Sequence, residues 1–355
     1  MLLFLFGLAA LILGAELLVR GASKLALSLG ISPLVVGLTV VAFGTSAPEL
    51  AVSVQSAWAG QVDIALGNVV GSNMFNILFI LGLSALIVPL TVHRQIIRQE
   101  VPVMIGASLL LWAMAADGGI GRLEGLLLAA LILAYTALVI RQSRRETAAS
   151  RTGAETAGAG GAWDASWGAQ ALLLLAGLAL LVIGSRWLVR AAVDFAHYLG
   201  VSELIIGLTI VSIGTSLPEV ATSILAALRG ERDIAVGNAV GSNIFNILSV
   251  LGFSAVVAPR ELPVAPALLA FDLPIMVAVA VACLPVFFVG ARISRGEGAL
   301  FLGLYFAYTV FLFLQATRHA ALSRYSLVMG GFVLPLLAAT LLALAWRHWR
   351  GGARH

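Results

Sequence analysis

The sequence predicts an all-α integral membrane protein, and three observations predict it. Of the 355 residues, 61% are hydrophobic and only 11% are charged, whereas soluble domains carry about 25% charged residues. The apolar residues form runs long enough for helices, which need about 20 residues to cross the hydrocarbon core. The chain also contains an internal repeat. These features exclude a soluble enzyme, and the single cysteine, Cys283, excludes a disulfide scaffold.

The apolar runs are bounded by charges, Gly or Pro, and we expect each to be one membrane-spanning helix. A β-barrel is excluded because its strands are only about 9–11 residues long and alternate in polarity. The expected spans are 2–28, 32–59, 64–88, 101–117, 122–141, 169–195, 202–229, 234–258, 266–290, 297–316 and 326–346.

The spans group into two halves and a C-terminal addition. The stretch between the halves is rich in Ala, Gly, Ser, Thr and Arg, which is typical of a flexible linker. The expected parts are a first five-helix repeat over 1–141, a linker over 142–168, a second five-helix repeat over 169–317, and an extra helix and tail over 318–355.

The basic residues indicate the orientation in the membrane. Cytoplasmic loops are enriched in Lys and Arg, and placing the N-terminus outside brings fifteen of the 21 basic residues to the inner ends of the spans. We therefore expect a multi-pass protein of the cell membrane with the central loop and the C-terminus in the cytoplasm. Because the basic residues form only short loop clusters, we expect no nucleic-acid partner.

The internal repeat carries most of the functional information. At an offset of 170 residues, positions 37–85 align with positions 207–255 without a gap, and 30 of the 49 positions are identical. Five spans in the first half place the second half in the opposite orientation. Inverted repeats are a plan of secondary transporters, whose substrate sites lie near the midplane on broken helices. A duplicated scaffold without transport is the alternative, but the shared residues are polar rather than merely apolar.

The first shared motif places a carboxylate inside an apolar run. It reads Gly-Thr-Ser-x-Pro-Glu and covers residues 44–49 and 214–219. A carboxylate at membrane depth is costly and indicates function. The proline has no N–H for the carbonyl four residues before it, so we expect a distorted helix with bared carbonyls at Gly44 and Gly214. The Thr and Ser precede the Glu by four and three residues, so all three share one helix face. The polar members are Thr45, Ser46, Glu49, Thr215, Ser216 and Glu219.

The second shared motif is Gly-Asn-x-x-Gly-Ser-Asn-x-Phe-Asn, over residues 67–76 and 237–246. Its small residues allow helices to approach closely. Ser72 and Asn76, like Ser242 and Asn246, lie four residues apart on one face, and we expect both asparagines to bind a cation. The other asparagines suit ion binding and interhelical hydrogen bonding equally well. These are Asn68, Asn73, Asn238 and Asn243.

Together the two motifs supply hard oxygen ligands and no cysteine or histidine. Such ligands suit Ca²⁺, and they also suit Na⁺ or protons. Two carboxylates give a charge of −2, which one Ca²⁺, two Na⁺ or two H⁺ would balance. Competition for one acidic pair is sufficient for exchange. A purely structural Glu49–Glu219 pair would need a basic partner, and neither motif contains one.

Both motifs in both halves make the chain resemble the cation/calcium exchanger superfamily, specifically the prokaryotic sodium/calcium exchangers. The resemblance covers the first ten spans. It implies a ten-helix core of two inverted five-helix repeats, with alternating access produced when the first and sixth helices slide against the rest. It also implies cation ligands at Thr45, Ser46, Glu49, Ser72, Asn76, Thr215, Ser216, Glu219, Ser242 and Asn246, joined by the backbone carbonyls of Ala42 and Ser212.

Two features depart from the family pattern. These exchangers often carry one Asp at the position of Asn76 or Asn246, and this chain has Asn at both. If that Asp is normally protonated, Asn is a neutral substitute; if it is charged, ion affinity and stoichiometry change. The apolar run over 326–346 is not needed by a ten-helix core, and we expect it to form an eleventh helix.

The sequence thus favours a secondary antiporter that exchanges Ca²⁺ for Na⁺ through the lipid bilayer. An exchanger that couples Ca²⁺ or another divalent cation to H⁺ is the nearest alternative. A channel would conduct without a counter-ion. A membrane-embedded enzyme is disfavoured because no nucleophile motif is present. We expect no cofactor beyond the transiently bound ions and see no sign of an obligate protein partner.

Overall fold

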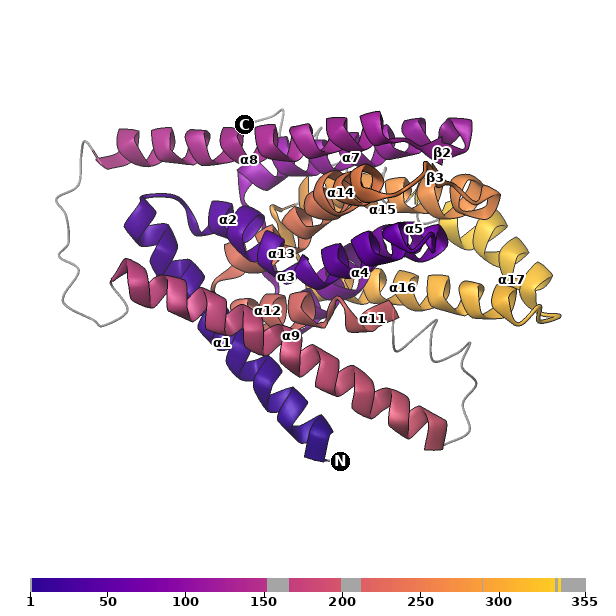
Figure 1. Ribbon diagram of the computed structural model, residues 1–355, viewed down its shortest axis with the longest axis horizontal. Coiled ribbons are helices and arrows are strands. Elements are labelled where there is room, and N and C mark those ends of the chain that lie inside the picture. The colour runs from indigo at the N-terminus through magenta and orange to yellow at the C-terminus, as the bar shows by residue number, and fades with distance from the viewer. Residues whose placement is uncertain (1, 152–165, 199–211, 289, 336–337, 340–355) are drawn as a thin grey trace.

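The computed structural model describes residues 2–151, 166–198, 212–288, 290–335 and 338–339, and it confirms the all-α membrane architecture (Figure 1). Eight described helices are long and apolar enough to cross a membrane, and a bent helix pair is a ninth candidate. The eight are Leu2–Leu29, Val62–Ile87, Ile96–Asp117, Arg122–Arg145, Trp167–Phe195, Arg232–Val257, Leu268–Phe288 and Arg295–Ala316.

Half of these eight spans are divided into shorter helical elements, with η marking π-helical or 3₁₀ segments. The first half contains α1 (Leu2–Leu29), α2 (Pro33–Val36), η1 (Gly37–Val41), α3 (Ala42–Thr45), α4 (Ala47–Trp58), α5 (Val62–Met74), η2 (Phe75–Leu81), α6 (Gly82–Ile87), η3 (Ile96–Glu100), α7 (Val101–Met114), η4 (Ala115–Asp117) and α8 (Arg122–Arg151). The second half contains α9 (Trp167–Tyr198), α11 (Ser212–Gly214), α12 (Leu217–Leu228), α13 (Arg232–Phe245), η7 (Asn246–Leu251), α14 (Gly252–Val257), η8 (Leu268–Asp272), α15 (Leu273–Phe288) and α16 (Arg295–Ala316), followed by α17 (Leu322–Val328) and η9 (Met329–Val333).

Three of the predicted spans are only partly described, and the span over 266–290 lacks only residue 289. The span over 202–229 is seen as α11 and α12, and residues 202–211 lie outside the described residues. The C-terminal run over 326–346 is helical at α17 and η9, and much of the remainder lies outside the described residues. The span over 32–59 is described throughout, and it is bent by 45° between Pro33–Thr45 and Ala47–Trp58.

Polar and apolar side chains are distributed as a membrane protein requires. Leu123, Leu133 and Leu175 are 83%, 70% and 67% exposed on the outer helices, whereas Glu49 and Glu219 are each only 1% exposed. In a bilayer these leucines would face lipid, which removes their apolar surface from water. The spans that carry the second motif, Val62–Ile87 and Arg232–Val257, are also the most enclosed.

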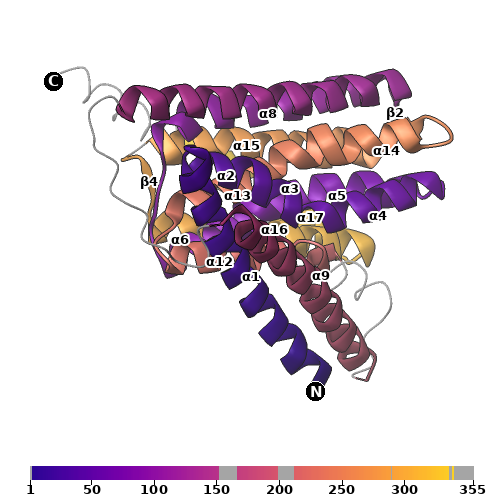
Figure 2. The same cartoon turned by 60° about the vertical axis from the view of Figure 1, so that its left-hand side comes forward.

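The helices α1 and α9 cross each other in close contact and run obliquely to the parallel helices of the core (Figures 1 and 2). Their backbones meet at glycines: a Cβ on Gly14 would lie 2.8 Å from the Gly177 carbonyl oxygen, and one on Gly184 would lie 2.8 Å from the Gly7 carbonyl oxygen. Any side chain here would force the helices apart, so small residues permit this crossing.

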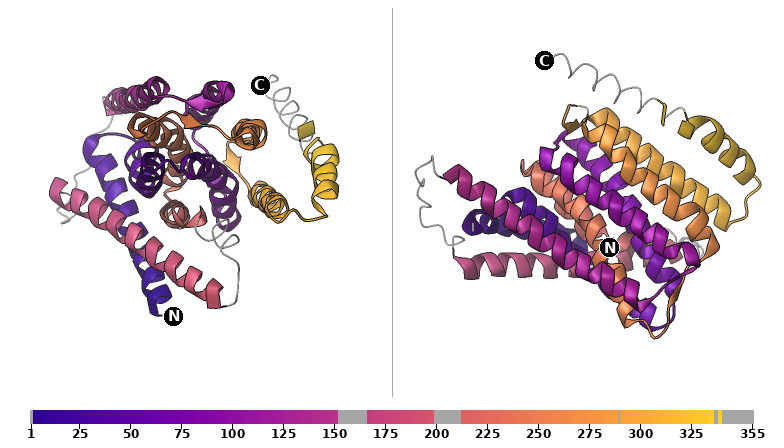
Figure 3. Two further views of the ribbon diagram at one scale, coloured as in Figure 1. Left: turned by 45° about the vertical axis from the view of Figure 1, so that its right-hand side comes forward. Right: turned by 90° about the horizontal axis from the view of Figure 1, so that it is seen from above.

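The same device recurs at two other crossings, between α6 and α16 and between α8 and α14. Gly82 meets Gly298 in the first, and Gly125 meets Gly252 in the second, with Cβ-to-carbonyl distances of 2.6–3.2 Å. Gly252 follows Gly82 by the 170-residue offset of the repeat. The crossing with α6 holds α16 against the core, on the opposite edge from α1 and α9 (Figure 3).

The only strands in the described residues are two-residue ladders between loops. Strand β1 (Leu90–Thr91) pairs antiparallel with β4 (Arg292–Ile293), and β2 (Gly119–Ile120) pairs antiparallel with β3 (Leu262–Pro263). Each ladder joins a loop of the first half to a loop of the second. They connect the halves outside the helical core and leave the all-α assignment unchanged.

Two carboxylate–tyrosine pairs join neighbouring outer helices. Tyr135 donates from its hydroxyl to Glu100 Oε2 at 2.7 Å, and Tyr308 donates to Asp272 Oδ1 at 2.8 Å. Both acids end a π-helical segment, and a proline follows two residues later in each case. The second pair explains Asp272, to which the sequence alone assigns no role.

We expect Tyr135→Phe to destabilise the protein by about 1–3 kcal/mol, because it leaves a buried carboxylate oxygen without a donor. Glu100 is fully buried and would keep only the donor Gln95 Nε2 at 2.9 Å. Thermal unfolding in detergent would measure the effect. Tyr308→Phe is the matched control, since Asp272 is only partly buried; an equal or larger loss for Tyr308→Phe would contradict the argument.

Candidate functional site

The two Pro-Glu motifs each begin a helix after a break. Ser46 (φ −79°, ψ 5°) and Ser216 (φ −89°, ψ 7°) lie outside helical geometry and directly precede α4 and α12. Pro48 and Pro218 follow at the first turn, where a missing N–H costs nothing. The sequence therefore breaks both helices at the same point. Glu49 and Glu219 fall in the first turn, where a helix favours negative charge.

The two carboxylates are held by serines from the opposite half. Ser216 Oγ donates to Glu49 Oε1 at 2.8 Å, and Ser46 Oγ donates to Glu219 Oε1 at 3.3 Å. Ser216 Oγ also lies 3.2 Å from Ser72 Oγ. Each bond is the image of the other under the 170-residue offset, so the two halves contribute equivalent side chains to one region.

A second layer of hydrogen bonds supports the broken helices. Asn68 Nδ2 donates to the Glu49 main-chain carbonyl at 3.3 Å and to Ser53 Oγ at 2.9 Å. Asn238 makes the matching bonds to the Glu219 carbonyl at 3.5 Å and to Ser223 Oγ at 2.9 Å. These bonds fix the position of each glutamate backbone against the neighbouring helix.

The motif threonines also bond across the two halves. Thr45 Oγ1 donates to Asn238 Oδ1 at 3.1 Å, and Thr215 Oγ1 donates to Asn68 Oδ1 at 3.4 Å. Asn73 and Asn243 likewise bond to the opposite half. All four asparagines for which the sequence left two roles open therefore have hydrogen-bond partners within the protein.

Within the described part of the chain, several buried oxygens of the two motifs have no hydrogen-bond partner. Leaving such atoms unpaired costs about 1–3 kcal/mol each, and native proteins rarely do so without a reason. All of these oxygens can coordinate a cation. They are Glu49 Oε2, Glu219 Oε2, Asn76 Oδ1, Asn246 Oδ1 and Ser242 Oγ.

The side chains predicted from sequence to bind cations lie together in one mostly buried region, and the structure describes all of them except one. Thr215 is half-buried, and the side chain of Ser212 lies outside the described residues. The remaining predicted residues are buried: Ala42, Thr45, Ser46, Glu49, Ser72, Asn76, Ser216, Glu219, Ser242 and Asn246.

Some carbonyls near the helix breaks already accept hydrogen bonds. The Ala42 carbonyl accepts from the Ser46 N–H at 3.0 Å, and Thr45 Oγ1 lies 3.4 Å from it. The Gly214 carbonyl accepts from Ser185 Oγ on α9 at 2.7 Å. The expectation that proline bares the Gly214 carbonyl is therefore wrong in part, because a serine from another helix replaces the lost N–H.

Sequence reasoning missed Ser53 and Ser223, which hold Asn68 and Asn238. A usable signal was present, since the two serines are related by the 170-residue offset and each follows its glutamate by four residues. Both side chains are fully buried. Residues four apart share a helix face, so the helix face of each glutamate extends one turn further than the motif suggested.

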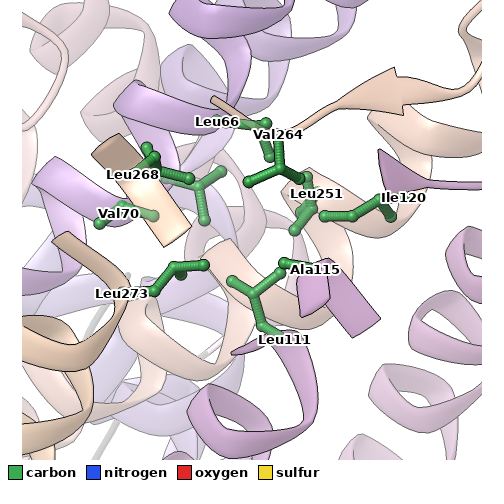
Figure 4. Close-up of a pocket in the computed structure, with 10 residues that line it drawn as sticks. Leu66, Val70, Leu111, Ala115, Ile120, Leu251, Val264, Leu268 and Leu273 are labelled. Carbon is green, nitrogen blue, oxygen red and sulfur yellow. The ribbon is translucent and has the colours of Figure 1, made fainter. Parts of the chain in front are cut away.

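The structure also contains a small apolar packing gap, too small to hold a water molecule, that does not suit a cation. It lies between α5, η7, α7 and α15, and its lining is wholly apolar (Figure 4). Its ten lining residues include Leu66, Leu111 and Leu273, and none of the motif oxygens. Because cations need oxygen ligands, the polar cluster around the glutamates is the candidate site.

Comparison with known proteins identifies the family of the chain. Residues 1–141 and 169–314 match the family described as sodium/calcium exchanger protein. The chain is 41% identical to the putative antiporter CaxA of Alkalimonas amylolytica, over 87% of this chain and 97% of the relative. It is 31% identical to the sodium/calcium exchanger MaX1 of Methanosarcina acetivorans, over 88% of this chain and 98% of the relative.

Among solved structures, the fold is similar to that of the sodium-calcium exchanger NCX_Mj. The TM-score is 0.73 at 30% sequence identity, covering 86% of this chain and 95% of the solved chain. These relatives are transporters rather than enzymes, and the apolar helices agree with a multi-pass membrane protein. The chain therefore belongs to the sodium/calcium exchanger protein family.

Proposed function

We propose that this cation/Ca²⁺ exchanger is a secondary antiporter that moves Ca²⁺ across the cell membrane in exchange for Na⁺. The observation that carries the proposal is the set of buried, unpaired oxygens contributed by both halves around Glu49 and Glu219. A desolvated cation would recover the cost of burying them. The names of MaX1 and NCX_Mj support Na⁺ and Ca²⁺ as the exchanged ions.

We assign the ion ligands to the motif oxygens. Glu49 and Glu219 supply the charge, and neutral oxygens complete the six to eight contacts that Ca²⁺ takes. The neutral ligands in this proposal are Thr45, Ser46, Ser72, Asn76, Thr215, Ser216, Ser242 and Asn246, with the carbonyls of Ala42 and Ser212.

Proton coupling is the second candidate, and one observation favours it. Asn76 and Asn246 are both neutral amides, so the site carries at most two negative charges. Two protons or one Ca²⁺ would neutralise it, whereas three Na⁺ would leave it at +1. A proton-coupled exchanger of Ca²⁺ or another divalent cation would therefore satisfy the same charge balance.

Uptake of ⁴⁵Ca²⁺ into proteoliposomes distinguishes the two. Vesicles loaded with Na⁺ are diluted into Na⁺-free buffer at equal pH, and a second set carries a pH gradient without Na⁺. We expect uptake only with the Na⁺ gradient. Uptake driven by the pH gradient alone would assign the protein to the proton-coupled class, and uptake without any gradient would indicate a channel.

We further propose that α1 and α9 slide together against the rest of the core to alternate access. Their close glycine crossing would let them move as one unit. We place the N-terminus outside and the central loop in the cytoplasm. Since Cys283 is the sole cysteine and is buried, new cysteines in the loops can be labelled from one side to test this orientation; labelling of the central loop from outside would refute it.

A further inference from the structure

The second motif contains a chain of amides whose orientation is determined by the main chain. Asn73 Nδ2 donates to the Asn243 main-chain carbonyl at 3.4 Å, and Asn243 Nδ2 donates to the Asn73 carbonyl at 3.1 Å. A main-chain carbonyl can only accept. Each of these two amides must therefore turn its nitrogen toward the opposite backbone.

The remaining atoms of Asn73 and Asn243 then orient the next pair. Asn73 Oδ1 accepts from Asn246 Nδ2 at 3.1 Å, and Asn243 Oδ1 accepts from Asn76 Nδ2 at 3.0 Å. Flipping any one amide would place two acceptors or two donors against each other. Because all four side chains are about 1% exposed, water cannot compensate for such a flip.

Each series of hydrogen-bonded amides ends in a buried oxygen that has no partner among the described residues. With their nitrogens engaged, Asn76 and Asn246 can present only Oδ1 to the site, and both Oδ1 atoms are unpaired. An amide that was free to rotate would present its NH₂ group half of the time, which repels a cation. The orientation therefore determines whether these residues are ligands at all.

We propose that Asn73 and Asn243 are positioning residues that each orient the ligand amide of the opposite half. This inference rests on the proposed function, since it assigns Asn76 and Asn246 as cation ligands. It also explains why amides occupy both positions. An ionised Asp at 246 would face Asn73 Oδ1, acceptor against acceptor, so this arrangement selects a neutral ligand and leaves the charge to Glu49 and Glu219.

The test is a double-mutant cycle on purified full-length protein, with Ca²⁺ affinity read by calorimetry. We expect Asn73→Ala to weaken Ca²⁺ binding about tenfold, which corresponds to the loss of one well-oriented ligand. In an Asn246→Ala background, Asn73→Ala should weaken Ca²⁺ binding almost no further, because the side chain that Asn73 orients is absent. In an Asn76→Ala background its full effect should remain. Asn243→Ala should show the reverse pattern.

Met276→Leu is the matched control. It removes the contact from Asn73 Nδ2 to Met276 Sδ at 3.7 Å. The hydrogen bonds of the Asn73 side chain to Asn243 and Asn246 stay in place, so we expect unchanged Ca²⁺ affinity. Equal effects of Asn73→Ala in the two backgrounds would overturn the proposal and indicate a general packing role.

The cycle is repeated on ion-free protein with the melting temperature as the readout. Coupling of Asn73 to Asn246, and not to Asn76, should persist there because the hydrogen bonds do not need the ion. A wild type that binds no Ca²⁺ would refute the proposed function, while the ion-free cycle would still decide whether the amides act as described.

Discussion

Glu49→Gln and Glu219→Gln should each abolish Ca²⁺ uptake while leaving the protein folded and inserted. Each change removes half of the charge of the site but preserves the acceptor for the serine of the opposite half. In the proposed complex each carboxylate is paired with the Ca²⁺, and removing one partner of a buried pair of opposite charges costs about 3–5 kcal/mol, where about 1.4 kcal/mol corresponds to tenfold in affinity. We therefore expect Ca²⁺ binding to weaken by at least about a hundredfold.

The measurement is ⁴⁵Ca²⁺ uptake into proteoliposomes, together with the rise in melting temperature that Ca²⁺ produces through binding to the folded state. Glu100→Gln is the matched control, because Glu100 is equally buried but bonds to Tyr135 and Gln95 outside the site. It should keep transport per folded molecule. Normal uptake in both site variants, or equal loss in the control, would contradict the assignment of the ligands.

Gly14→Val should also eliminate transport, through packing instead of ion binding. A Cβ at this position would lie 2.8 Å from both the Gly177 carbonyl oxygen and the Leu181 nitrogen. These distances are below van der Waals contact, so α1 and α9 must separate. Overpacking of this kind costs about 1–3 kcal/mol, and it removes the close crossing that would let the two helices slide as a unit.

Uptake and Ca²⁺ affinity should respond differently to this change. Because Gly14 lies outside the two motifs, we expect Gly14→Val to lose uptake while Ca²⁺ binding to the purified protein stays within about threefold of wild type. Gly106→Val is the control, since a Cβ on Gly106 meets nothing within 4 Å. Transport at the wild-type rate in Gly14→Val would show that the close crossing is not needed for the cycle.

The membrane class, most of the spans and the polar residues that gather in the candidate site could be predicted from the sequence. Long apolar runs have few structural outcomes in lipid, because every backbone group must be hydrogen-bonded within the protein, and runs of this length satisfy that as helices. Against such runs a carboxylate such as Glu49 stands out, and its repetition at Glu219 locates the site. The proline two residues into each helix also predicts the break at Ser46 and Ser216.

The tertiary structure decided which atoms meet. Ser216 bonds to Glu49 across 167 residues and Asn246 bonds to Asn73 across 173 residues, and no periodicity specifies contacts between different helices. The same holds for Ser185, which replaces the N–H that Pro218 lacks at Gly214. A motif specifies which oxygens are available, but only the packing of the helices determines which are used in hydrogen bonds and which remain without a partner.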